Sequence, residues 1–104
     1  MNTARGQAPS NDVNAKPRLV FFYSPTSGRC RRLEGLLANI LRLRRNHEAF
    51  EVVRVDIGER PDLAGRFRID VVPTLLVIEG SRVVRRIISP KGVELKRELA
   101  KWLV

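Results

Sequence analysis

The chain has 104 residues, enough for one domain with a modest hydrophobic core and too few for two. Twenty basic residues against eleven acidic ones give a net charge of +9, which allows acidic partners. The arginines are spread over nearly every segment, however, and this predicts solvated faces rather than a nucleic-acid-binding surface. One cysteine excludes an intramolecular disulfide, and with a single distant histidine it makes no zinc set. We expect neither a metal nor a cofactor.

Residues 1–17 are rich in Asn, Ser, Ala, Gly and Pro and show no apolar period. This composition predicts a flexible leader, followed by one domain over residues 18–104. The leader has no apolar stretch of the kind found in secretory signals, and no run approaches the length of a membrane span. We therefore expect a soluble, cytoplasmic monomer without membrane partners.

The first apolar run, Arg18–Tyr23, lies between two proline-containing segments and is typical of a strand buried on both faces. After it, apolar residues recur at steps of three and four, which predicts a helix to about Arg45. Ser27 or Thr26 is its expected N-cap. The residues of the predicted core-facing stripe are Cys30, Leu33, Leu36, Leu37, Ile40 and Leu41.

A second strand is predicted at 50–56, and with the helix before it this makes a βαβ unit with parallel strands. A short helix, a hairpin and an amphipathic closing helix follow. These later elements are predicted at 60–67, 75–78, 82–88 and 91–104. The order β-α-β-α-β-β-α indicates an α/β fold, with a four-stranded mixed parallel and antiparallel sheet flanked by helices.

Three stretches carry a resemblance to a known family: SGRC at 27–30, VRVD at 53–56 and VVPTLLVIEG at 71–80. SGRC resembles the Cys-Gly-Pro-Cys motif of thioredoxins, and VVPTLLVIEG resembles the cis-proline segment of that family and the hairpin after it. Because the three stretches occur in the same order as in that family, residues 18–104 resemble a domain of the thioredoxin-like superfamily. The resemblance implies a minimal, glutaredoxin-sized thioredoxin fold without the additional first strand and helix of thioredoxins proper.

The same resemblance implies a dithiol site that has lost its attacking thiol. Disulfide exchange needs an exposed thiolate that attacks and a second thiol that resolves the mixed disulfide. Ser27 stands at the attacking position, and its hydroxyl is too weak an acid to replace a thiolate without a base. Cys30 matches the resolving position, Thr26 replaces a tryptophan, and Phe21 replaces a buried aspartate used for proton transfer. The full dithiol cycle cannot run within this chain.

Cys30 allows two interpretations. At the start of a helix, beside Arg29 and Arg31, a thiol is favoured in its thiolate form and could carry a one-thiol reaction. On an apolar helical stripe, a lone cysteine is a small buried hydrophobe. We favour the second interpretation because reactivity requires exposure.

The resemblance also implies that the Val72–Pro73 peptide bond is cis, and that the backbone of Val72 pairs with an extended substrate segment beside the motif. The alternative is that these two residues only shape the turn before a strand, and both can hold at once. The predicted binding residues are Thr26, Gly28, Arg29, Val72 and Pro73.

Three functions stay open at this point. The favoured one is a redox-weak or redox-inactive thioredoxin-like domain that binds peptide or protein thiols at the surface formed by SGRC and the cis-proline. The second is a monothiol disulfide oxidoreductase that uses Cys30, with a protein thiol or disulfide or glutathione as its partner. The third is a basic module that binds a polyanion such as nucleic acid.

Overall fold

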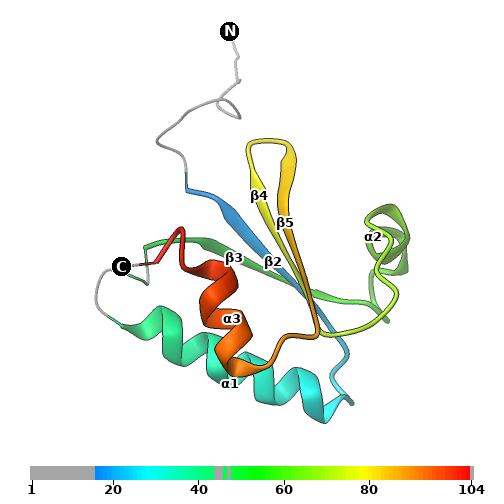
Figure 1. Cartoon of the computed structure of the whole chain (residues 1–104). Coiled ribbons are helices and arrows are strands. Elements are labelled where there is room, and N and C mark those ends of the chain that lie inside the picture. The colour runs from blue at the N-terminus through cyan, green and yellow to red at the C-terminus, as the bar shows by residue number, and fades with distance from the viewer. Residues whose placement is uncertain (1–15, 44–45, 47, 104) are drawn as a thin grey trace, which may run out of the picture.

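The computed structural model describes residues 16–43, 46 and 48–103. They form β2 (Arg18–Tyr23), α1 (Gly28–Arg42), β3 (Glu51–Asp56), α2 (Pro61–Arg66), β4 (Thr74–Glu79), β5 (Arg82–Ile88) and α3 (Gly92–Leu99), as Figure 1 shows. The predicted order of strands and helices is confirmed. The predicted leader, apart from Lys16 and Pro17, lies outside the described residues.

The four strands lie in the order β3-β2-β4-β5. Strand β2 runs parallel to β3 and antiparallel to β4, and β4 and β5 form an antiparallel hairpin, so the sheet is mixed as predicted. The parallel pair follows from α1, which carries the chain back along the sheet between β2 and β3. Strand β2 therefore has a hydrogen-bonded neighbour along each edge.

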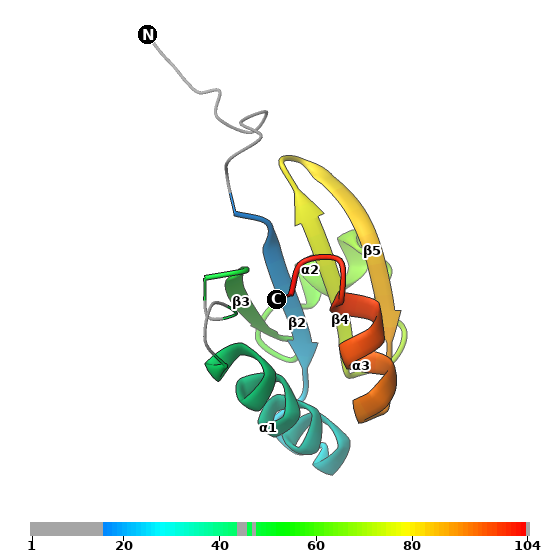
Figure 2. The same ribbon diagram turned by 60° about the vertical axis from the view of Figure 1, so that its left-hand side comes forward.

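Helices cover both faces of the sheet. Figures 1 and 2 show α1 and α3 together on one face and the short α2 on the other. Alternate residues of β2 supply both layers: Leu19 and Phe21 belong to the core cluster under α1 and α3, and Val20 and Phe22 belong to the cluster on the α2 side. This explains why the apolar run of β2 is continuous rather than alternating.

Helix α1 is shorter than predicted, because it ends at Arg42 rather than near Arg45. Leu43 has an extended backbone, and the buried Asn46 side chain donates a hydrogen bond from Nδ2 to the carbonyl oxygen of Ile40 at 3.3 Å. That bond satisfies a carbonyl group in the last turn of the helix, where no backbone N–H of the helix is available as a donor. The predicted apolar stripe ends at Leu41, so the prediction extended the helix beyond the last residue that the stripe supports.

Two other expectations for the helices were wrong in detail. Helix α3 ends at Leu99, although Trp102 and Leu103 still pack against the core cluster under α1 and α3 as irregular chain. Trp102 is also fixed by a hydrogen bond from Nε1 to Glu79 Oε2 at 2.9 Å. Leu36, expected on the buried stripe of α1, is 41% exposed.

Replacing Leu95 by Ala should lower the free energy of unfolding by about 2–5 kcal/mol, because its fully buried side chain would leave a cavity between α3 and the sheet. The matched control is Leu43→Ala, which removes the same atoms from a side chain that is 54% exposed and should cost no more than about 0.5 kcal/mol. Urea unfolding followed by circular dichroism measures both. Equal losses would contradict the described core.

Candidate functional site

A short turn connects β2 to α1 and fixes the position of the SGRC motif. The backbone N–H of Ser27 donates to the carbonyl oxygen of Ser24 at 3.1 Å, and the hydroxyls of Ser24 and Thr26 lie 3.0 Å apart. Ser27 has an extended backbone and is the N-cap of α1, where its Oγ accepts a hydrogen bond from the N–H of Cys30 at 3.2 Å. The hydroxyl at the attacking position therefore caps the helix.

The Cys30 side chain points into the core. Its residue is 2% exposed and belongs to the same buried cluster as Phe21, Leu33 and Leu37. A thiol must be reached by its reaction partner, so this burial favours the packed interpretation over the reactive one. Where the family carries a buried acid for proton transfer, Phe21 supplies an apolar ring that is 1% exposed.

The cis-proline segment lies at the same end of the sheet as the motif. The Val72–Pro73 peptide bond is cis. Thr74, the first residue of β4, pairs with Phe22 near the end of β2, so the residues before β4 come beside the turn that follows β2. The Ser89 N–H donates to the carbonyl oxygen of Pro73 at 2.8 Å, and Arg29 Nη1 donates to Ser89 Oγ at 3.0 Å. Ser89 thus links the motif helix to the cis-proline segment.

The predicted binding residues differ in their accessibility. Thr26 and Arg29 are exposed, Gly28 and Val72 are half-buried, and Pro73 is buried. Within the described residues, neither the N–H nor the carbonyl oxygen of Val72 has a hydrogen-bond partner. This leaves a main-chain donor and acceptor available beside the motif.

Exposed apolar side chains border the cis-proline segment. Val71 directly precedes Val72 and is 48% exposed, and Ile88, which pairs with Thr74, is 57% exposed. The carbonyl oxygen of Val71 accepts a hydrogen bond from the Thr74 hydroxyl at 2.7 Å, which holds the segment against the start of β4. The border of the candidate site is therefore apolar on the side away from α1.

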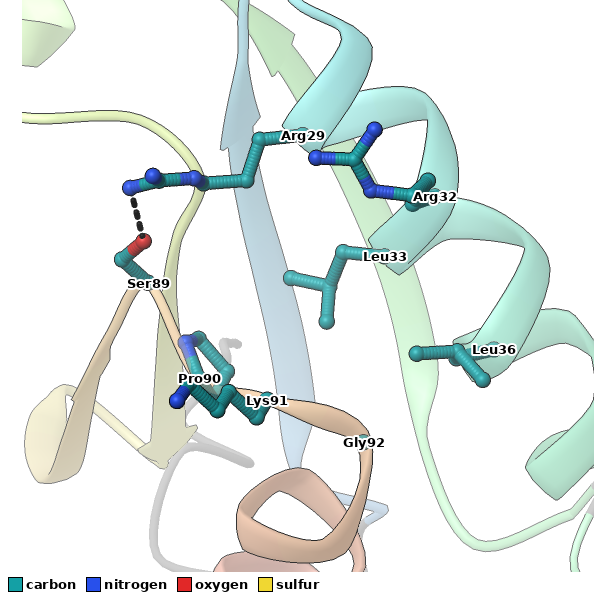
Figure 3. A pocket seen from close by; sticks show the side chains of 8 residues that line it. All are labelled: Arg29, Arg32, Leu33, Leu36, Ser89, Pro90, Lys91 and Gly92. Atoms are coloured by element: carbon teal, nitrogen blue, oxygen red, sulfur yellow. Dashed lines mark hydrogen bonds between the residues drawn. The ribbon is translucent and has the colours of Figure 1, made fainter.

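A pocket of about 440 Å³ opens beside the motif, between α1 and the connection from β5 to α3 (Figure 3). The sequence patterns did not predict this pocket. Arg29 and Arg32 are three residues apart and so lie on one side of the helix, which could have indicated a positively charged surface there. Lys91 joins them only through the tertiary structure. The lining residues are Arg29, Arg32, Leu33, Leu36, Ser89, Pro90, Lys91 and Gly92.

In the described part of the chain, no group of three or more His, Cys, Asp and Glu side chains is arranged to hold a metal ion. Within the same residues, no helix is both long enough and apolar enough to cross a membrane.

The comparisons with known proteins agree with this geometry. The thioredoxin family model matches residues 4–104. The chain belongs to the thioredoxin family. Thioredoxin from Mycobacterium tuberculosis is 31% identical over 82% of this chain and 72% of the relative. The germline-specific thioredoxin Deadhead from Drosophila melanogaster superposes with a TM-score of 0.76 at 19% identity, covering 86% of this chain and 84% of that structure. The predicted thioredoxin-like fold and family are both confirmed.

Another relative shows that such a domain can be part of a longer protein. The bifunctional thioredoxin reductase/thioredoxin of Mycobacterium leprae is 31% identical over 82% of this chain, which spans only 18% of that relative. In this chain, the SGRC motif contains a single thiol, that of Cys30.

In the folded protein, Cys30 should react with iodoacetamide at neutral pH much more slowly than in urea, because the reagent must wait for an opening of the core around a side chain that is 2% exposed. Mass spectrometry of the quenched protein measures the rate. A matched reference is Ser24→Cys, whose additional thiol lies in the half-buried turn before α1 and should react faster. Equal rates for Cys30 in the folded and unfolded chain would contradict the packed arrangement.

Proposed function

We propose that this protein is a redox-inactive thioredoxin-family domain that binds an extended segment of a peptide or protein partner at Thr26–Arg29 and Val72–Pro73. The observation that carries the proposal is the 2% exposure of Cys30 together with a serine at the attacking position. Without an accessible thiolate, the chain has no group that can open a disulfide. The surface around the motif can still bind a partner segment, even though the disulfide chemistry is lost.

The unpaired main chain of Val72 supports this binding mode. An extended peptide that adds to a free strand-like segment gains main-chain hydrogen bonds, and side-chain contacts then select its sequence. Val71 and Thr26 are both exposed and offer an apolar contact and a hydroxyl to such a segment. We expect the domain to act as a monomer, and the cytoplasmic location stays a prediction.

Two alternatives have less support. A monothiol reaction at Cys30, with glutathione or a protein thiol, requires an accessible sulfur, and the burial of this residue opposes it. A polyanion-binding module would need its cations gathered on one face, whereas exposed arginines occur on α1, β3, α2, β5 and α3.

The protein should not catalyse reduction of insulin disulfides by dithiothreitol above background, and Cys30→Ser should leave this result unchanged. Ser27→Cys should raise the rate, because the new thiol can attack the insulin disulfide, Cys30 can displace the reduced insulin chain, and dithiothreitol can reduce the resulting internal disulfide. Ser24→Cys adds a thiol outside the motif and should stay at background. Turnover by the parent protein that disappears in Cys30→Ser would overturn the redox-inactive assignment.

Titration of ¹⁵N-labelled protein with an unstructured ten-residue peptide of alternating Leu and Gln should shift the amide signals of Thr26, Gly28 and Val72. The physical reason is that the peptide's main chain would take the free donor and acceptor of Val72. Heteronuclear correlation spectra provide the measurement, and signals from α2, on the opposite face of the sheet, serve as an internal reference. If no signal moves, or if only distant signals move, the peptide-binding proposal fails.

A further inference from the structure

The charged side chains that line the pocket in Figure 3 are all positive. Two arginines of α1, Arg29 and Arg32, and Lys91 at the N-cap of α3 contribute cations, and no acidic residue lines the pocket. Across residues 16–43, 46 and 48–103, the ion pairs with carboxylates use other cations. The side chains of these three cations therefore make no ion pair among the described residues, and the nearby Glu94 carboxylate is bonded to the backbone N–H of Lys91 at 2.8 Å.

The rest of the lining is mostly apolar, and Ser89 is its one uncharged polar side chain. Leu33 and Pro90 are buried and form the inner part, and the half-exposed Leu36 lies towards the opening. A Cβ atom added at Gly92 would lie 3.3 Å from Leu36 Cδ1, so the start of α3 packs closely on α1 at this point. A ligand that fits both parts has an anionic group next to an apolar one.

Arg29 connects the pocket to the proposed peptide site. Its guanidinium is held by Ser89 Oγ at 3.0 Å, and the Ser89 N–H is bonded to the Pro73 carbonyl. Ser89 therefore both lines the pocket and is bonded to the cis-proline segment, although Val72 and Pro73 do not line the pocket themselves.

We propose that the pocket binds a glutamate or aspartate side chain of the bound peptide, with an adjacent apolar residue against Leu36. This inference rests on the proposed function and adds the partner's chemistry to it. Carboxylates form charge-assisted hydrogen bonds with guanidinium groups, and these are stronger than hydrogen bonds between neutral groups. The site consequently selects acidic, apolar segments among all those that the main chain of Val72 can pair with.

The test compares two labelled ten-residue peptides, one of alternating Leu and Glu and the other of alternating Leu and Gln, by fluorescence anisotropy at constant ionic strength. The acidic peptide should bind about tenfold more tightly. Arg32→Gln/Lys91→Gln should remove this preference by lowering the affinity for the acidic peptide about tenfold. The matched control, Arg66→Gln/Lys96→Gln, makes the same charge change at exposed helical residues outside the pocket and should keep the preference.

The outcomes separate this inference from the proposed function. A preference that survives Arg32→Gln/Lys91→Gln, or that is lost equally in the control, overturns the pocket assignment and indicates non-specific attraction. If both peptides bind equally and the Val72 amide signal shifts, the pocket assignment is overturned but the proposed peptide-binding function is supported. If neither peptide binds, both proposals fail. A fourth outcome is that inorganic phosphate binds through Arg32 and Lys91 while the protein shows no preference for the acidic peptide. This result would assign the pocket to a free anion and overturn the inference.

Discussion

Strand β2 is confined in two directions, and the candidate site depends on this confinement. Its edges are paired with β3 and β4, and its two faces supply the core clusters on either side of the sheet. A strand held in this way ends at a defined place, and only residues 24–27 separate its end from α1. The first turn of α1 must therefore pack directly on the end of the sheet, which explains why Cys30 is buried.

The same confinement brings distant segments together. Because Phe22 pairs with Thr74, and Thr74 pairs with Ile88, the residues that precede β4 and those that follow β5 emerge beside the end of β2. Ser89 then bonds to the cis-proline segment through its backbone and receives a hydrogen bond from Arg29. Three loops that are far apart in the sequence form one surface as a consequence of strand register.

Local patterns predicted the strands well and the site only in part. The strand Arg18–Tyr23 was placed correctly because its inner residues, 19–22, are all apolar and the strand is bounded by turn residues. The exposure of Cys30 could not be deduced, since its position at a helix start and its place on an apolar stripe favour opposite outcomes. Tertiary contacts decide such cases: Cys30 joins the core cluster that also contains Phe21 and Leu95, and Lys91 lines a pocket whose other cations belong to α1.

Serine at position 27 affects stability and chemistry in opposite ways. A hydroxyl oxygen accepts the Cys30 N–H more strongly than a thiol would, so α1 is well capped where the family carries its reactive group. Recognition at this surface must then come from groups that do not react. In the proposed function, the main chain of Val72 supplies affinity that is independent of sequence. In the further proposal the cations around the pocket supply discrimination, because a neutral side chain would offer them no negative charge.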